Sequence, residues 1–465
     1  MKRHFNKVAI ATSLVILTAC SSSSYVDEPL VKPQLPQSWH TDARSLKDNQ
    51  SWVTPIATDQ LLDFISIGLN TNQQLIQLAL EVEVQKQQLN ISDSSFWPEL
   101  NLSANSARNG DSDNSSSSNN LSLNLSYELD IWGKLSDSAK AAKLNLLTAE
   151  ANYQQARDAL VADVVIAYYK VVTSAELVKL FERRTENAKL NFEIIESGYL
   201  QGLSAALDVY LTQNEFYTEN ANLQSQRSQH NQDIRTLERL LGGYPAGKLL
   251  IDEQLPLLPQ GIKIGVPSEL VKRKPQLQAA WYQLLAQDAL VAFTQKQRYP
   301  ALSLGADIGS SSSDIANLLS GDYTSWSVFA GITAPIFNAG RLESQTEQQK
   351  LKLKQQEQEY LSTLFGAFEV VENNLDLDAS LQLQYRSTLK AQENALQAET
   401  LSFEQYQSGL VSYTTVLDAQ TRAFVAQSSV ISLKNQIIAN RIGLHLALGG
   451  DLDASVTNAS DTEEE

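Results

Sequence analysis

The chain has 465 residues, a formal net charge of −17 at pH 7 and an isoelectric point near 4.8, which argues against a nucleic-acid-binding protein because phosphates require a basic surface. Its one cysteine excludes an intrachain disulfide, and its four histidines do not have the spacing of metal ligands. Glycine and proline are scarce, at 20 and 12 residues, which favours long uninterrupted elements.

The N-terminus has the pattern of a secretory signal. Basic residues precede a short apolar run from Val8 to Leu17, which is too short to span a bilayer. The run ends in Leu17-Thr18-Ala19-Cys20, which resembles the lipobox of bacterial lipoproteins, where the cysteine is lipidated after cleavage. We therefore expect a signal peptide at residues 1–19 and a lipid on Cys20. Ser21, by the same resemblance, favours sorting to the outer membrane, and the mature chain carries a charge of about −20 because three basic residues are removed.

A proline-containing polar segment at residues 20–55 follows and is predicted to be an extended, lipidated tether. The first predicted helix runs from Asp59 to Ser95. Apolar and polar residues then alternate with a period of two, which predicts strands at about 99–108 and 120–130 joined by a loop rich in Ser, Asn, Gly and Asp. From Ser136 the period becomes helical for about 60 residues, or roughly 90 Å. A tight turn at Gly202 leads into a returning helix of about 39 residues.

The second half of the chain repeats the first. Three glycine landmarks recur at one offset of 207 residues, and an aromatic-proline pair recurs at 202: Gly133 and Gly340, Gly202 and Gly409, Gly242 and Gly449, Pro98 and Pro300. We interpret this as a duplication. The remaining parts are a first repeat at 56–243, an equatorial segment at 244–267, a second repeat at 268–450 with a helix at 268–298 and strands at about 300–308 and 325–334, and an acidic tail at 451–465 that we expect to be disordered.

The four strands have the length and alternation of outer-membrane β-barrel strands. Aromatic residues near their ends suit the two membrane interfaces: Trp97, Tyr127, Trp132, Tyr299, Tyr323 and Trp326. A soluble sheet is the alternative, but no segment has the composition to cover the apolar faces. Four strands cannot close a barrel and open edges are excluded from lipid. Two chains would supply eight strands with a filled interior, whereas three would supply twelve and leave a lumen, so we predict a homotrimer.

These features together resemble the TolC-like outer membrane factors, in the lipoprotein branch. The resemblance rests on the lipobox, the duplicated strand-loop-strand-long-helix unit, the glycine-basic pairs at the strand-to-helix joints, and a repeated Tyr-x-x-Gly-Leu followed by Leu-Asp. It implies a mainly α fold with a membrane β-barrel portion, formed by a homotrimer with a 12-stranded barrel and a 12-helix periplasmic tunnel of antiparallel coiled-coil helices. It also implies a periplasmic membrane-fusion adaptor and an inner-membrane pump as partners, besides outer-membrane lipid.

The two glycine turns are the candidate functional sites. One interpretation is that they only reverse the chain, as glycine turns do; the resemblance instead implies that they are adaptor-binding tips. The residues concerned are Tyr199, Gly202, Leu203, Leu207, Asp208, Tyr406, Gly409, Leu410, Leu417 and Asp418. Asp208 and Asp418 could alternatively be helix N-terminal charges that favour the helix dipole. Asp418 and Tyr406 are the candidate gate, with Asp418 forming a carboxylate ring and Tyr406 a hydrogen bond that holds it.

No catalytic motif or metal-spaced cluster is present in the sequence, so we expect no enzymatic activity, no metal and no cofactor other than the lipid on Cys20. Asp376 and Asp378 are read as a solvated helix face. The predicted function is a passive outer-membrane conduit for small toxic compounds, gated at its periplasmic tip. The alternatives are a conduit for type I protein secretion, a metal-ion efflux channel, and a structural periplasmic coiled-coil lipoprotein that does not conduct.

Overall fold

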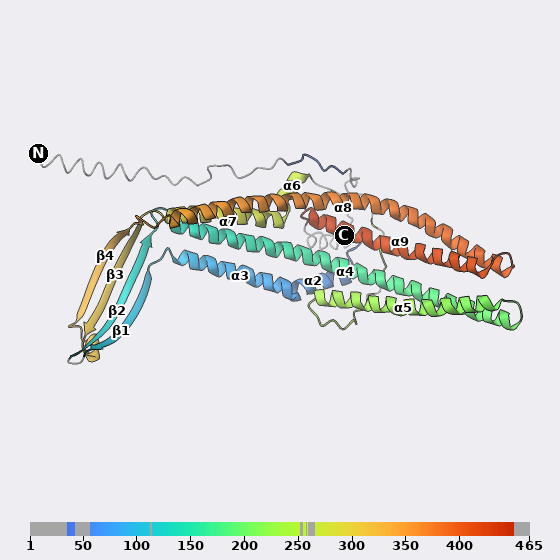
Figure 1. The fold of residues 1–465 in the computed structure, drawn as a ribbon, viewed down its shortest axis with the longest axis horizontal. Helices are drawn as coiled ribbons and strands as arrows, with labels where there is room; N and C mark the ends of the chain where they lie inside the picture. Colours follow the sequence, from blue (N-terminus) through green and yellow to red (C-terminus); the bar gives the residue numbers. More distant parts are fainter. Residues whose placement is uncertain are drawn as a thin grey trace, which may run out of the picture. The chain divides into compact units, whose positions relative to one another are not determined.

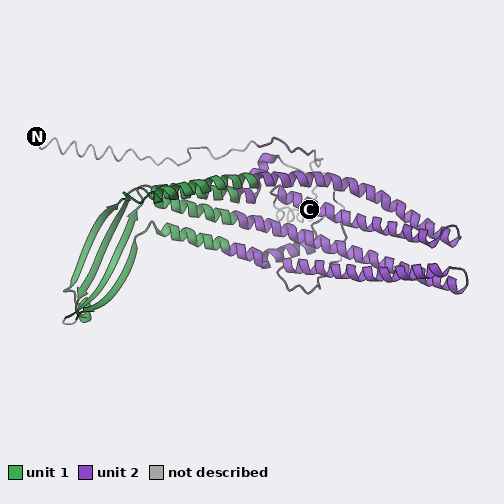
Figure 2. Ribbon diagram, in the orientation of Figure 1, with its two compact units in different colours: residues 1–33, 81–150, 279–362 green, residues 34–80, 151–278, 363–465 purple. Residues whose placement is uncertain are grey.

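The computed structural model describes residues 35–41, 56–111, 114–251, 254–256, 258 and 266–450. The chain divides into two compact units, coloured separately in Figure 2. Within the described ranges, unit 1 holds residues 81–150 and 279–362, and unit 2 holds the remainder. Cys20 and the acidic tail lie outside the described residues.

Unit 1 contains one antiparallel sheet of four strands in the order β1-β2-β3-β4 (Figure 1). The strands are β1 (Glu99–Gly110), β2 (Ser115–Leu129), β3 (Ala301–Ser312) and β4 (Thr324–Thr333), and a short 3₁₀ helix, η2 (Ile315–Leu319), lies in the β3–β4 loop. The two repeats therefore contribute one hairpin each, and β2 pairs with β3 across them. Among the described residues, β1 and β4 each have one edge without a strand partner.

The strand register gathers the apolar residues of all four strands on one face. Leu102 lies opposite Leu123, which lies opposite Ile308, which lies opposite Trp326. Because side chains alternate between faces, this row places the alternating leucines, isoleucines and valine of the four strands on the same side. Leu102 and Trp326 are 71% and 76% exposed. The sheet thus presents a continuous apolar face that no described part of the chain covers.

The opposite face of the sheet is polar. Ser103 and Ser122 share a hydrogen bond of 2.7 Å between their hydroxyls, and Ser327 donates to Asp307 at 3.3 Å. Phe329 is an exception on this face, where its ring lies over Gly305 and leaves no room for a side chain there.

The helices repeat with the same lengths in both halves. The long helices α4 (Lys134–Leu200) and α8 (Arg341–Gln407) have 67 residues each, and the returning helices α5 (Ala206–Leu240) and α9 (Tyr413–Ala447) have 35 each. All four starts and ends are related by the 207-residue offset. In the described part of the chain, no helix is long and apolar enough to cross a membrane.

The first helix predicted in each repeat is divided in two, which corrects the single helices expected at 59–95 and 268–298. The first becomes α2 (Asp59–Thr71) and α3 (Gln73–Ser94), and the second becomes α6 (Pro267–Arg273) and α7 (Pro275–Lys296). Asn72 caps α3 by accepting hydrogen bonds from the N–H groups of Gln74 and Leu75 at 3.0 and 3.1 Å. Pro275 begins α7, because its missing N–H costs nothing in the first turn.

Each of these breaks lies against the glycine that ends a returning helix. A side chain at Gly242 would collide with the carbonyl group of Thr71, and one at Gly449 would crowd the backbone of Arg273 and Lys274. Both glycines also have positive φ, at 71° and 69°. The repeated Gly-Gly pairs therefore allow a close approach between backbones at equivalent points of unit 2.

The main apolar core of unit 2 surrounds the middle of α4. Tyr168 and Tyr169 are fully buried beside apolar residues of α2, α5 and α9. Tyr169 donates a hydrogen bond of 3.0 Å to the carbonyl oxygen of Ile56, and Leu255 from the segment between the repeats also packs here. The core thus joins helices of both repeats with the connecting segments.

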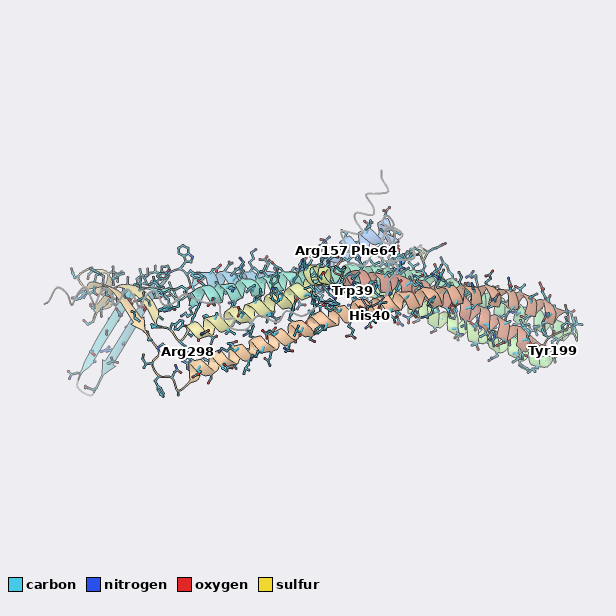
Figure 3. The ribbon with its side chains drawn as sticks, turned by 90° about the horizontal axis from the view of Figure 1, so that it is seen from above. Trp39, His40, Phe64, Arg157, Tyr199 and Arg298 are labelled. Carbon is cyan, nitrogen blue, oxygen red and sulfur yellow. The ribbon has the colours of Figure 1, made fainter. Side chains whose placement is uncertain are left out.

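The described part of the predicted tether, residues 35–41, contacts α8 (Figure 3). Trp39 packs edge-to-face on Phe368, with ring centroids 6.0 Å apart. The backbone N–H groups of His40 and Thr41 donate to the Glu372 carboxylate at 2.7 and 3.1 Å, and these bonds lower its pKa against the opposing effect of burial. This short stretch is therefore fixed to α8 although it has no core of its own.

Asp378 is not part of a solvated helix face, as the sequence suggested. Its carboxylate binds the buried Arg441 guanidinium, with an Nε–Oδ1 distance of 3.0 Å. At the equivalent positions of the first repeat, Val171 and Ile234 are apolar and buried. One ion pair in the second hairpin thus replaces a hydrophobic pair in the first.

Candidate functional site at the helical hairpin turns

The two helical hairpins, α4–α5 and α8–α9, end in turns of the same construction. Gly202 and Gly409 have φ of 76° and 72°, a left-handed conformation that glycine adopts without strain. Leu203 N–H bonds the carbonyl of Gly198 at 2.8 Å, and Leu410 N–H bonds that of Gln405 at 2.9 Å. These bonds are the helix-ending pattern in which the residue after the glycine reaches back five positions. The repeated Tyr-x-x-Gly-Leu sequence thus specifies a helix end in both repeats.

The turns expose apolar side chains that have little contact with the rest of the chain. Leu203 and Leu410 are 80% and 74% exposed, and the space beside both glycines is open. The predicted residues Tyr199 and Leu207 are also exposed, and Tyr199 lies at the end of its hairpin (Figure 3). Within the described residues, these two apolar turns therefore lack a partner, which is typical of an interaction surface.

Leu417 differs from these residues because it is half-buried. It packs against an apolar cluster, called here the tip cluster, which draws on all four hairpin helices. The tip cluster consists of Ile195, Val209, Leu211, Phe403, Tyr406, Tyr413, Val416 and Leu417. Leu417 thus contributes to the packing of the four helices near the turns and not to the exposed surface.

A hydrogen bond joins the two hairpins beside the tip cluster. The Tyr406 hydroxyl donates to Oδ2 of Asp208 at 3.2 Å, from the end of α8 to the first turn of α5. Burial and the neighbouring Asp208 charge both raise the pKa of Tyr406, so its hydroxyl stays protonated and remains a donor. The ring of Tyr406 also packs edge-to-face on the buried Tyr413, with centroids 5.3 Å apart.

The structure corrects the partner expected for Tyr406, which was Asp418. The Asp418 carboxylate instead accepts from Nε of Arg422 at 2.8 Å, four residues along α9, in an exposed ion pair. The two aspartates are also not equivalent by the repeat. Helix starts at 206 and 413 place Asp208 opposite Thr415, in the first turn, whereas Asp418 lies at the sixth residue of α9. The Leu-Asp resemblance is offset by 210 residues and is out of register with the fold.

Sequence reasoning missed a charged cluster farther from the turns. Arg184 of α4 binds Glu215 and Glu219 of α5, at 3.0 and 2.9 Å, and its guanidinium lies over the Phe424 ring of α9. An alignment of the two repeats could have pointed to this cluster. Arg184 and Glu219 are charged, whereas the equivalent residues of the second repeat, Ala391 and Ala426, are not. No group of His, Cys, Asp and Glu side chains capable of holding a metal occurs among the described residues.

Comparison with known proteins identifies the family of the duplicated unit. The sequence pattern of the outer membrane efflux protein family matches residues 64–243 and 266–450, which are the two repeats. The chain is 26% identical to the cation efflux system protein CusC of Escherichia coli, over 93% of this chain and 96% of that protein. It is 27% identical to outer membrane protein OprJ of Pseudomonas aeruginosa, over 96% of both chains.

Solved structures share the fold over nearly their whole length. A crystal structure of CusC superposes with a TM-score of 0.78 at 25% identity, covering 91% of this chain and 99% of the other. The CmeC outer membrane channel of Campylobacter jejuni superposes with a TM-score of 0.82 at 22% identity, covering 95% and 98%. The family match spans most of the chain and both copies of its duplicated unit, and the chain therefore belongs to the outer membrane efflux protein family.

Proposed function

We propose that three copies of this chain form an outer-membrane channel whose β-barrel is closed by pairing of strands between copies. The channel passively conducts small toxic compounds to the exterior. The observation that carries this proposal is the four-stranded sheet, which has one exposed apolar face and two edges without strand partners in the described chain. Backbone groups cannot remain unpaired in lipid, so the β1 and β4 edges must meet edges of other copies. Three copies supply twelve strands, whose polar faces would line a lumen while their apolar faces contact lipid.

The helices continue the conduit below the membrane in this proposal. Each copy contributes two hairpins, so three copies supply the helices of a 12-helix tunnel. The exposed leucines at the two turns, Leu203 and Leu410, fit contact with the helices of a periplasmic adaptor, which links the channel to an inner-membrane pump. The channel carries no energy source of its own and depends on that pump.

The resting channel must be narrow at its helical end, because otherwise the outer membrane would leak. The Tyr406–Asp208 bond ties the two hairpins of each copy together there, so we assign it to closure. Asp418 is assigned to a carboxylate ring around the channel axis, whose charge Arg422 partly compensates in each copy.

The lipid on Cys20 is also part of the proposal. It rests on the lipobox pattern alone, since Cys20 lies outside the described residues. Cys20→Ser should abolish labelling by a radioactive fatty acid, whereas insertion should persist because the strand faces contribute independently of acyl chains. Recovery of unmodified Cys20 in a mature, correctly sorted protein would exclude lipidation.

The channel itself can be tested with the purified full-length protein. We expect a trimer that migrates as one band on gels and dissociates on heating, and stepwise conductance after addition to a planar lipid bilayer. A heat-insensitive monomer that produces no conductance would contradict the proposal and favour the structural, non-conducting alternative.

A further inference from the structure

The two hairpins of unit 2 also meet between the main core and the tip cluster, at a site distinct from the Tyr406–Asp208 bond. Phe424 of α9 inserts beside α4, where its ring centroid lies 4.9 Å from that of Phe181 in an edge-to-face contact. Cζ of Arg184 also lies over the Phe424 ring, 4.2 Å from its centroid, a cation–π geometry. One aromatic side chain of the second hairpin therefore contacts two side chains of the first.

The Arg184 guanidinium is fixed in place by carboxylates of its own hairpin. Its Nη2 binds Oε1 of both Glu215 and Glu219, and the Glu219 side chain is only 4% exposed. Thr185 also donates from its hydroxyl to the Glu219 carbonyl oxygen at 3.2 Å. The first hairpin thus presents a rigid cation, rather than a mobile surface charge, to the Phe424 ring.

This cluster is an addition to the repeated fold. The residues equivalent to Arg184 and Glu219 by the 207-residue offset are Ala391 and Ala426, and the residue equivalent to Phe424 is Tyr217, which is 60% exposed. In the second half the long helix and the returning helix form a hairpin without these charges, so formation of a hairpin does not require them. What the cluster adds to the first hairpin is its contact with Phe424 of the second.

The cluster connects to the hydrogen bond near the turns. The buried Tyr413 packs on Tyr406 and hydrogen-bonds the Asn191 side chain, and the Glu215 charge contributes to the raised pKa of Tyr413 after burial. Along α9, Phe424 lies eleven residues from Tyr413, which is about 17 Å. Glu215 therefore interacts with both sites, through an ion pair with Arg184 and through its charge near Tyr413.

We propose that Arg184 and Phe424 form an inter-hairpin latch, a second closure point that holds the α8–α9 hairpin against the α4–α5 hairpin in the resting channel. The latch rests on the proposed channel function, because its role is to keep that channel closed. Both are positioning residues, since they act on the width of the helical end through the helices that carry them. A cavity of about 220 Å³ lies beside the latch, lined by residues of both hairpins including Arg184 and Phe424, so the helices have space to shift there.

The test compares two substitutions of Phe424 in full-length trimers incorporated into planar bilayers. Phe424→Leu keeps an apolar side chain but removes the ring over the guanidinium, and it should raise the open probability by about fivefold. Phe424→Tyr keeps the ring and should behave like the wild type. Arg227→Gln is the matched control, because it breaks a half-exposed ion pair of 2.7 Å with Glu182 inside the first hairpin and should leave conductance unchanged.

Trimer mobility and helical content should be the same in all these variants, which separates a latch from a general structural role. Combination of Phe424→Leu with Tyr406→Phe should raise the open probability by a factor that differs from the product of the single effects, because both substitutions weaken the attachment of the same two hairpins. The double variant R184Q/E219Q removes the buried Arg184–Glu219 pair together, leaves only the more exposed Glu215 without its partner, and should also open the channel.

Two outcomes overturn the latch. The first is a wild-type open probability in both Phe424→Leu and R184Q/E219Q. The second is the same open probability in Phe424→Leu and Phe424→Tyr. If the wild-type protein conducts and the variants have the same open probability as the wild type, the latch alone is refuted. A wild-type trimer that never conducts refutes the proposed channel together with the latch.

Discussion

The apolar face of the sheet can be tested by placing one charge on each side of β2. Leu123 lies in the row that also contains Leu102, Ile308 and Trp326, whereas its neighbour Ser122 points to the polar face. If the apolar face contacts lipid near the middle of the bilayer, Leu123→Arg should cost about 2–4 kcal/mol, which is roughly 30- to 700-fold in the folding equilibrium. Ser122→Arg gives up its hydrogen bond with Ser103, so only about 1 kcal/mol is expected from that change.

The assay is urea unfolding of the two variants and the wild type from phosphatidylcholine vesicles, at one protein concentration because the trimer equilibrium depends on it. The difference between Leu123→Arg and Ser122→Arg is the decisive quantity, since the two changes add the same charge to adjacent residues of one strand. Equal destabilisation by both substitutions would refute a lipid-facing apolar side. A larger cost for Ser122→Arg would show that the polar face is the one turned to lipid.

Three further predictions concern the helical hairpins. Tyr406→Phe removes the hydrogen bond to Asp208, so it should raise open probability roughly tenfold in single-channel recordings; an unchanged value would remove this bond from the gate. Gly409→Trp places a bulky residue in an exposed left-handed turn and should leave trimers intact but abolish efflux in cells, and full efflux would locate the adaptor contact elsewhere. Burial raises the pKa of Glu399 from its ordinary 4.5, so its stabilising contribution is complete below pH 4.5 and is lost as the pH rises through the raised pKa. The melting temperature of Glu399→Gln, followed by circular dichroism, should therefore fall less between pH 4.5 and neutral pH than that of the wild type. The same dependence of melting temperature on pH in both proteins would contradict the assignment.

Much of the fold was predictable because it is encoded by local periods. Alternation of two marks the strands, and the change to a helical period marks α4 and α8, whose lengths follow from the absence of proline between residues 134–200 and 341–407. The break between α6 and α7 could also have been predicted, since proline is unfavourable in the interior of a helix and Pro275 begins α7. The break between α2 and α3 has no proline, and its only sequence feature is Asn72, which caps α3. The two glycine turns were located correctly because a left-handed helix end requires glycine locally.

The duplication and the order of strands, long helices and returning helices could be predicted because they depend on residues close together in the sequence. The contacts between side chains could not, because partners depend on the rotation of each helix and on how the hairpins pair. Tyr406 therefore bonds Asp208 rather than Asp418, and Arg184 lies over Phe424, 240 positions along the chain. Neither contact follows from periodicity, because one residue along a helix turns a side chain by about 100° and thereby changes its partner.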